Sequence, residues 1–472
     1  MGLCLHSPNP VDPVVGAWPV PRPMIALNDK TRATLKELLN LAWPVVLARI
    51  GIMTMGLTDA IVVGHYASRE LAYHSLAWAP SSVVLTTAVG LMMGVQIVTA
   101  RLRGEGRHSE IGAVLRRGMV YALQIGIASM LALAVFGPWV MNNVSFEEGL
   151  GAGASGPLVV FALSMPFYLI SVAAQFFLEG LSKPKPGMWA MWVANGVNIG
   201  LNLLLVPDLL GLGVDGAVAS AWATFGARLA LAVFLIVYIL RLPEAKSWNL
   251  WTRPARDRET EREQIKVGLG AGGSNFIEVG AFAAMTVIAG LLGTNETASW
   301  AIVINMSAIV FMLPMGLSSA TAVLVGRAYG AQDREGVLRA GFAGIAVVTV
   351  LALLVALIIW PTAGLLVSAY TTDPALVAIA GPALVLATLF FVADGIQVVA
   401  AQANRAAGDV WWPTIMHFLS YGAIMMPLGW VLAHRIGVDG LVWAVIIASL
   451  VSGTLLTGRF VRVARRLAQQ SA

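Results

Sequence analysis

The chain has 472 residues, of which 58% are hydrophobic and 12% are charged. Because soluble domains carry about 25% charged residues, this composition excludes an ordinary soluble protein and predicts many α-helical membrane spans. The net charge of +5 does not indicate nucleic-acid binding, since the basic residues lie at the ends of the apolar runs. One cysteine, six scattered histidines and the lack of any Gly-Lys pair give no reason to expect a disulfide framework, a metal site, a cofactor or a Walker A loop. Nothing in the sequence indicates an enzyme.

Apolar runs long enough to cross a bilayer recur from one end of the chain to the other. They predict an all-α polytopic membrane protein with twelve transmembrane helices. The runs lie at residues 37–63, 71–98, 112–138, 156–179, 187–207, 215–240, 267–292, 298–325, 337–366, 378–403, 411–433 and 438–463.

One long polar segment, 241–266, separates the sixth run from the seventh. We interpret it as a cytoplasmic linker between an N-lobe of six spans (37–240) and a C-lobe of six spans (267–463). Residues 1–36 and 464–472 are expected to be cytoplasmic tails. Lys and Arg cluster in the linker, before span one, after spans two, four, eight and ten, and at the C-terminus. The positive-inside rule therefore predicts that both termini are cytoplasmic.

The two halves are related in sequence. The segment Gly90–Gly104 (GLMMGVQIVTARLRG) aligns with Gly316–Gly330 (GLSSATAVLVGRAYG), and further matches follow in the same order. Because each repeat has an even number of spans, both insert the same way up, and a pseudo-twofold axis then lies along the membrane normal. Repeats of this kind place a substrate site between two halves that rock against each other.

Three acidic residues lie inside the predicted spans and not at the first or last two residues of a span. Glu278 is the one charge in the run 267–292, Asp394 lies in FFVADGIQVVAAQ, and Asp59 lies near the outer end of the first span. A charged side chain at the bilayer centre costs about 2.5–3.5 kcal/mol on insertion scales, so such residues are candidates for a role in transport.

Several short motifs resemble those of the multidrug and toxic compound extrusion (MATE) family, in particular its NorM-type branch. The resemblance runs from about Leu38 to Arg462. Its motifs are Ile304–Gly316 (INMSAIVFMLPMG), Asn275–Val279 around Glu278, Asp394–Ala400, Asp59 in GLTDAIVVG, and Asn198 with Asn202.

The resemblance implies two six-helix lobes and an ion-coupled exporter of organic cations and drugs in a bacterial inner membrane. Three positions depart from the family's pattern. Phe390 stands where some NorM-type members have an ion-facing Tyr, Ser220 where many have Thr, and Arg101 where a Gln is usual. Phe offers a cation the face of its ring but no hydroxyl.

Glu278 and Asp394 are the main candidates for a C-lobe site that binds the coupling ion and the substrate. Two carboxylates in one cavity titrate as a coupled pair, which can hold a proton, bind Na⁺ or attract a cationic drug. Gln397 lies one helical turn after Asp394 and faces the same way. Asn305, Phe390 and, less directly, His417 are further candidates to line this cavity. The alternative is that these groups only form hydrogen bonds between helices.

Asp59, Asn198, Asn202 and Ser220 are candidates for an ion site in the N-lobe. Asn198 and Asn202 are four residues apart and share one helix face. A carboxylate with amide and hydroxyl oxygens suits Na⁺, the carboxylate alone suits a proton, and the alternative is a buried polar cluster that only fixes packing. Arg49 lies mid-span and too far along the helix to pair with Asp59. It snorkels, pairs with another acid or faces the cavity.

The favoured function is a secondary active antiporter in which inward H⁺ or Na⁺ drives export of organic cations by rocking of the lobes. We expect contact with membrane lipids and a monomer. One alternative is a lipid-linked glycan flippase, which would need cationic residues in its central cavity; only Arg49 and Arg228 qualify. The other is a non-transporting receptor or scaffold, which would have no use for charges buried in both lobes.

Overall fold

A computed structural model describes residues 29–143, 149–250, 257–371 and 373–469. Within these ranges twelve helical stretches are long and apolar enough to cross a membrane, which confirms the predicted all-α fold and number of spans. Most of the two predicted tails, residues 1–28 and 470–472, lies outside the described residues. The helices are α1 (Asp29–Tyr66), α2 (Ser68–Gly104), η1 (His108–Glu110), α3 (Ile111–Asn143), α4 (Leu150–Gly180), α5 (Lys185–Leu205), α6 (Gly216–Arg241), η2 (Pro243–Lys246), α7 (Arg258–Leu292), α8 (Thr294–Gly330), α9 (Arg334–Ser368), α10 (Pro374–Ala406), α11 (Trp411–His417), η3 (Phe418–Met425), α12 (Met426–Ile436) and α13 (Val438–Gln469).

Several helices extend beyond the apolar runs that predicted them. The last part of the predicted linker already belongs to α7, whose N-cap is Asp257: its side chain accepts hydrogen bonds from the backbone N–H groups of Glu259 and Thr260. The hydroxyl of Thr260 and the guanidinium of Arg107 hold the pKa of Asp257 at about 2, so this cap is ionised at neutral pH. Capping of this kind lets a helix continue beyond the hydrophobic part of its sequence.

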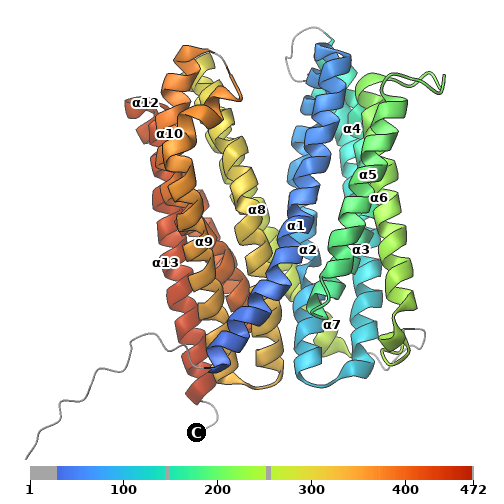
Figure 1. Cartoon of the computed structure of the whole chain (residues 1–472), viewed down its shortest axis with the longest axis vertical. Coiled ribbons are helices and arrows are strands. Elements are labelled where there is room, and N and C mark those ends of the chain that lie inside the picture. The colour runs from blue at the N-terminus through green and yellow to red at the C-terminus, as the bar shows by residue number, and fades with distance from the viewer. Residues whose placement is uncertain (1–28, 144–148, 251–256, 372, 470–472) are drawn as a thin grey trace, which may run out of the picture.

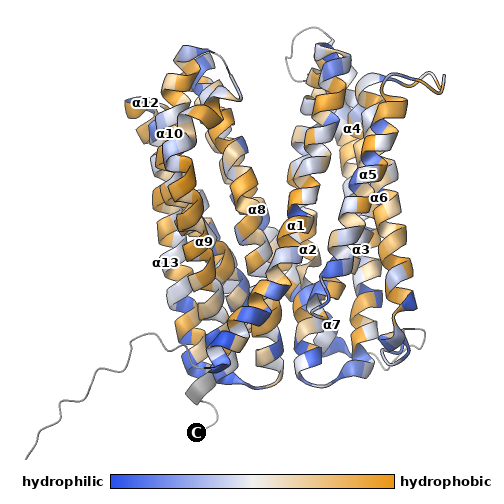
Figure 2. Ribbon diagram, in the orientation of Figure 1, coloured by the Kyte–Doolittle hydropathy of each residue, from blue (hydrophilic) through white to orange (hydrophobic). Residues whose placement is uncertain are grey.

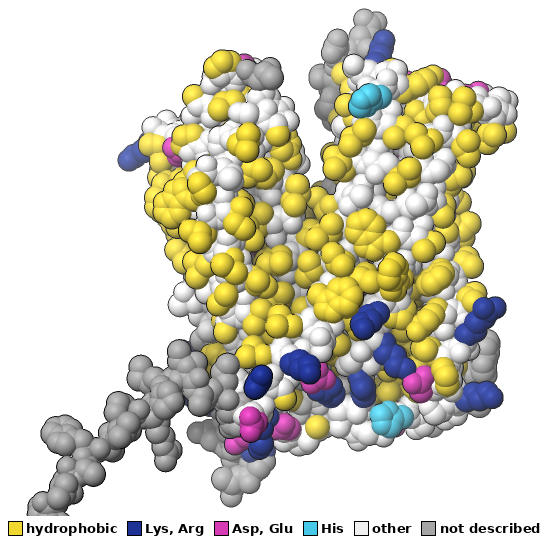
Figure 3. Space-filling view, in the orientation of Figure 1, with side chains coloured by type: hydrophobic (Ala, Val, Ile, Leu, Met, Phe, Trp, Pro, Cys, Tyr) yellow, Lys and Arg dark blue, Asp and Glu magenta, His cyan; other side chains and the backbone are white. Residues whose placement is uncertain are grey.

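The helices form two bundles with a cleft between them. Figure 1 shows α1–α6 in one bundle and α8–α13 in the other, and the space-filling view shows a V-shaped notch that opens at the top. Hydrophobic residues cover the length of the bundles, whereas hydrophilic residues gather towards the lower ends (Figure 2). On this face Lys and Arg side chains gather near the bottom (Figure 3), so the cleft opens at the end away from the basic rim.

The first helix of each half crosses from one bundle to the other. The N-terminal part of α1 packs in a core cluster with C-half residues: Leu38 and Leu41 lie with Val325 and Val337. In the same way α7 begins against the N-half, where Gln264 donates to the backbone oxygen of Val114. The sequence-based boundaries at residues 37 and 267 therefore do not divide the helices of one bundle from those of the other, because α1 and α7 each contribute to both bundles.

Symmetry-related glycines allow the two halves to approach closely. A Cβ atom on Gly104 would overlap the backbone oxygen of Arg327, and a Cβ on Gly330 would overlap that of Arg101. These four residues are the aligned positions of the two repeats, so the contact is reciprocal. The pseudo-twofold axis passes between the lower ends of α2 and α8, where the bundles are joined.

Substitution of Gly94 tests this close packing. A Cβ on Gly94 of α2 would overlap the backbone oxygen of Gln264 on α7. We expect Gly94→Ala to lower the free energy of unfolding by about 1–3 kcal/mol, since overpacking forces backbone shifts. Gly458→Ala in α13 is the matched control, because its Cβ meets no atom within 4 Å and alanine favours a helix by about 1 kcal/mol. The midpoint temperature of thermal unfolding in detergent should fall for Gly94→Ala and rise for Gly458→Ala. Equal shifts for the two variants would contradict the close packing at Gly94.

Candidate functional site

The two C-lobe carboxylates are joined through one amide. Gln397 Nε2 on α10 donates to Asp394 Oδ1 at 3.1 Å and to Glu278 Oε1 on α7 at 3.3 Å. Asp394 and Gln397 lie one turn apart on α10 and therefore share a face. Asp394 is 7% exposed, whereas Glu278 is only half-buried. The sequence-predicted pair thus meets in the structure, with Glu278 as its more accessible member.

Tyr421 is a member of this site that the sequence did not reveal. Its hydroxyl donates to Asp394 Oδ1 at 3.2 Å and lies 3.4 Å from Ser449 Oγ on α13. Tyr421 lies in η3, a π-helical segment within the span that continues from α11 through η3 to α12. Pro427, the second residue of α12, lacks an N–H donor, which favours a wider turn before it. Such π-helical turns recur at functional sites.

The other predicted C-lobe residues occupy different environments. Phe390 is buried one turn before Asp394, and its ring packs edge-on against Phe391 with centroids 4.9 Å apart. His417 is buried, with its ring edge-on to Tyr421. The side chain of Asn305 is exposed on α8, and no hydrogen bond found among the described residues joins it to either carboxylate. Asn305 therefore does not contact the carboxylate pair, and its place in the lining of the C-lobe cavity stays a prediction.

The N-lobe candidates surround Asp59 on α1. Its Oδ1 accepts from Nδ2 of Asn198 at 2.9 Å and of Asn202 at 2.7 Å, both on α5. Its Oδ2 accepts from Thr224 Oγ1 on α6 at 2.5 Å. The hydroxyl at this carboxylate therefore comes from Thr224 and not from Ser220, which is buried one turn earlier with no hydrogen-bond partner for its Oγ.

The two hydroxyls of α6 should respond differently to substitution. Thr224→Val keeps the shape of the side chain but removes the donor to a buried carboxylate, so we expect a loss of about 1.5–3 kcal/mol in the free energy of unfolding. Ser220→Ala removes a hydroxyl that makes no hydrogen bond, and we expect no loss. Thermal unfolding of both variants in detergent checks this. A larger loss in the free energy of unfolding for Ser220→Ala than for Thr224→Val would instead support Ser220 as the hydroxyl at Asp59.

Arg49 finds its partner in a buried cluster that joins the two halves. Its Nη2 lies 3.5 Å from Glu179 Oε1 on α4, and its guanidinium lies over the ring of Phe176. Glu179 Oε2 accepts from Gln96 Nε2 on α2 at 2.7 Å and from Ser319 Oγ on α8 at 2.6 Å. Of the alternatives that the sequence left open for Arg49, the structure selects pairing with another acid. Because Glu179 lies at the end of a predicted span, its sequence context did not reveal this partner.

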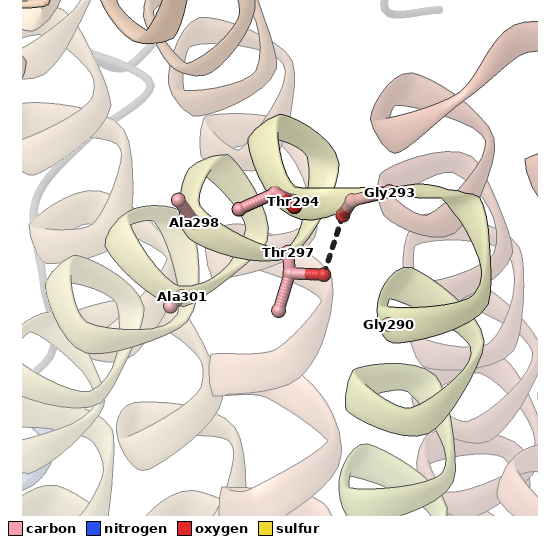
Figure 4. A pocket seen from close by; sticks show the side chains of 6 residues that line it. All are labelled: Gly290, Gly293, Thr294, Thr297, Ala298 and Ala301. Carbon is pink, nitrogen blue, oxygen red and sulfur yellow. Dashed lines mark hydrogen bonds between the residues drawn. The ribbon is translucent and has the colours of Figure 1, made fainter.

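A separate surface hollow of about 450 Å³ lies at the α7–α8 turn. Its lining is Gly290, Gly293, Thr294, Thr297, Ala298 and Ala301 (Figure 4), none of them ionisable. Thr297 Oγ1 donates to the backbone oxygen of Gly293 at 2.6 Å, which stabilises the turn. Gly290 is more than three helical turns beyond Glu278, so this hollow is distinct from the carboxylate pair.

The structure has twelve spans in two repeats, buried acids in both halves and a cleft between the bundles. These features define a polytopic membrane transporter. Comparison with known proteins identifies its family. The MatE family profile matches residues 44–204 and again residues 271–431. The chain belongs to the MATE family and to its NorM branch, which is a family of transporters and not of enzymes. The double match also confirms the internal repeat.

Two relatives and one solved structure agree with this assignment. The chain is 53% identical over 428 residues to "Probable multidrug resistance protein NorM" of Caulobacter vibrioides, covering 90% of this chain and 91% of that protein. It is 30% identical to "Multidrug resistance protein NorM" of Photobacterium profundum, covering 85% and 88%. A solved structure titled "Outward-facing conformation of a multidrug resistance MATE family transporter of the MOP superfamily" has a TM-score of 0.86 at 18% identity, covering 92% of this chain and 97% of that one. That likeness supports the fold.

Proposed function

We propose that this transporter exports organic cations and other drugs in exchange for protons bound at Glu278 and Asp394. The observation that carries this proposal is the amide of Gln397, which joins two membrane-embedded carboxylates from different helices. A proton on this pair lowers its negative charge and thereby weakens its attraction for a cationic drug. Ion and drug then compete for the same carboxylates, which is what exchange requires, provided that each stabilises a different facing state.

The hydrogen-bond donors at the C-lobe pair argue against Na⁺ as the coupling ion. Both Gln397 Nε2 and the Tyr421 hydroxyl point their hydrogens at the carboxylates. A hard cation such as Na⁺ needs oxygen ligands directed at it, and Phe390 supplies no oxygen where a Tyr hydroxyl is found in some members. The same argument holds for Asp59, which accepts from two amide nitrogens and one hydroxyl. We assign Asp59 a supporting role, as a second proton site.

The charge distribution supports an orientation in the membrane. Lys and Arg gather near the lower rim in Figure 3, and the positive-inside rule places such a rim in the cytoplasm. Both termini would then be cytoplasmic, and the cleft would open to the outside of a bacterial inner membrane. The chain would act there as a monomer, with its substrate site complete within one copy.

A glycan flippase is disfavoured because both cavity arginines are engaged. Arg49 pairs with Glu179, and Arg228 Nη1 donates to Ser164 Oγ at 2.6 Å while its guanidinium lies over the ring of Tyr168. Neither cation is left to bind an anionic headgroup. The buried acids likewise argue against a receptor or scaffold, since burying them is costly without a use for their charge.

Export from liposomes tests the proposal. Purified protein is reconstituted, a fluorescent organic cation is loaded inside, and either a proton gradient or a Na⁺ gradient is imposed. We expect efflux with the inward-driving proton gradient and only basal efflux with the Na⁺ gradient. Efflux driven by Na⁺ alone would refute the proton assignment, and the lack of efflux with either gradient would refute the antiport proposal.

A further inference from the structure

Below the carboxylate pair, three helices place a second layer of polar side chains. Ser274 precedes Glu278 by one turn on α7, and His417 precedes Tyr421 by one turn in the span formed by α11, η3 and α12. Arg405 follows Asp394 by about three turns on α10, so it lies on nearly the same face. Because α7 and α11 run opposite to α10, this layer lies on the basic-rim side of the pair. Arg405 Nη2 donates to Ser274 Oγ at 2.6 Å, which joins α10 to α7 at this level.

His417 is buried in this layer without a hydrogen bond. It is 3% exposed, and neither Nδ1 nor Nε2 has a partner. Two other polar residues of the C-lobe site also have buried atoms without partners, namely Arg405 Nε and Gln397 Oε1. A buried polar atom without a partner is costly, and groups of such atoms are the usual places of buried water. These atoms offer a water molecule both donors and acceptors.

We propose that His417 is a proton-relay residue, which exchanges protons through bound water between the carboxylate pair and the basic-rim side of the C-lobe. This inference rests on the proposed function, since it needs a proton at the pair. Tyr421 contacts the ring of His417 from its own span. The charged groups of the site on the neighbouring helices are Glu278 on α7 and Asp394 and Arg405 on α10. Arg405 brings a positive charge to this level of the C-lobe, where Ser274 holds its Nη2.

The relay conserves protons at each step. The protonated carboxyl of Glu278 gives its proton to a water molecule while that water gives one of its own protons to a ring nitrogen of His417. The ring then gives the proton on its other nitrogen to a second water, so the carboxylate is left ionised and the imidazole neutral. Imidazole suits this role because its two nitrogens can accept and donate in turn.

Chemical rescue of His417→Ala tests the relay. Proton-driven efflux from liposomes is measured for the wild type, for His417→Ala, and for His434→Ala as an exposed control. A positioned acid–base group typically contributes a hundredfold or more, so we expect His417→Ala to slow efflux at least tenfold. The dissociation constant of the drug should stay within about twofold. Added imidazole should restore efflux by occupying the space left by the ring.

Two results would overturn the inference. One is wild-type efflux by His417→Ala. The other is slow efflux that imidazole does not restore, which shows a structural role for His417. If His417→Ala does not fold, efflux is measured for His417→Gln instead. Efflux at the wild-type rate by that variant would also overturn the relay. Failure of the proposed function looks different, because the wild type itself would then show no proton-driven efflux. If only the relay inference is wrong, the wild type still shows proton-driven efflux.

Discussion

Asp394→Asn and Glu278→Gln variants are each expected to lower proton-driven export of an organic cation to the rate of protein-free liposomes. Both substitutions keep the size of the side chain and its ability to accept the hydrogen bond from Gln397. Neither amide, however, can take up and release a proton as a carboxylate does. The neutral site also loses its attraction for a cationic drug. The measurement is efflux of a fluorescent cation under an imposed proton gradient, together with the dissociation constant of the drug.

The control is the same chemical change at an exposed acid. The side chain of Glu335 is 81% exposed and lies 3.7 Å from Arg339, where an exposed ion pair contributes about 0–1 kcal/mol. Glu335→Gln should therefore export at the wild-type rate. If Glu278→Gln or Asp394→Asn does the same while remaining folded, the C-lobe pair is not the coupling site.

The second large effect is expected at the buried ion pair that joins the halves. Arg49→Met should lower the free energy of unfolding by about 3–5 kcal/mol, because it leaves Glu179 charged and buried without its partner. Glu179 is 7% exposed, and Arg49 is 4% exposed. The double variant Arg49→Met with Glu179→Leu removes both charges, so it should be more stable than the single variant. Thermal unfolding in detergent measures all three proteins.

Arg435→Met serves as the control for the loss of an arginine, because Arg435 is exposed at the end of α12. We expect it to unfold like the wild type. A double variant less stable than Arg49→Met alone would contradict the account, since it would mean that Glu179 is stabilised by something other than Arg49, such as Gln96 and Ser319.

The spans, the repeat and the isolated acids could be predicted because each depends on local sequence. An apolar run of sufficient length has to become a helix in a bilayer, and an acid such as Glu278 stands out within it. The pairing of Asn198 and Asn202 follows from their spacing on one helix. The structure joins Glu278 and Asp394 through Gln397 and brings Asn198 and Asn202 to Asp59. Within the described residues, Asn305 and Ser220 are not hydrogen-bonded to these carboxylates, and the roles of all these residues in transport remain proposals.

The partners that the sequence missed all come from other helices. Ser220 and Thr224 lie one turn apart on the same face of α6, so spacing alone does not say which is level with Asp59. Tyr421 reaches Asp394 from η3, and the irregular turn depends on how the span packs. Glu179 and Arg49 lie far apart in the chain and meet only in the folded structure. Depth in the membrane and rotation about the helix axis are set by tertiary packing, and a single sequence does not give them.

The crossing of α1 and α7 between the bundles also depends on tertiary packing and does not follow from the sequence pattern. Both helices are apolar enough to lie in either bundle, and the contacts of Leu38 and Gln264 decide their paths. A helix that belongs to both bundles is well placed to transmit rocking between them. Glu278 lies beyond this crossing on the same helix, α7.

The most direct test of the central claim is proton release on drug binding. Purified protein in weakly buffered detergent solution is mixed with an organic cation, and the pH is followed with an indicator dye. Competition at Glu278 and Asp394 predicts that protons are released as the drug binds, and that the Asp394→Asn variant releases fewer. Drug binding by the wild type without any release of protons would contradict the account.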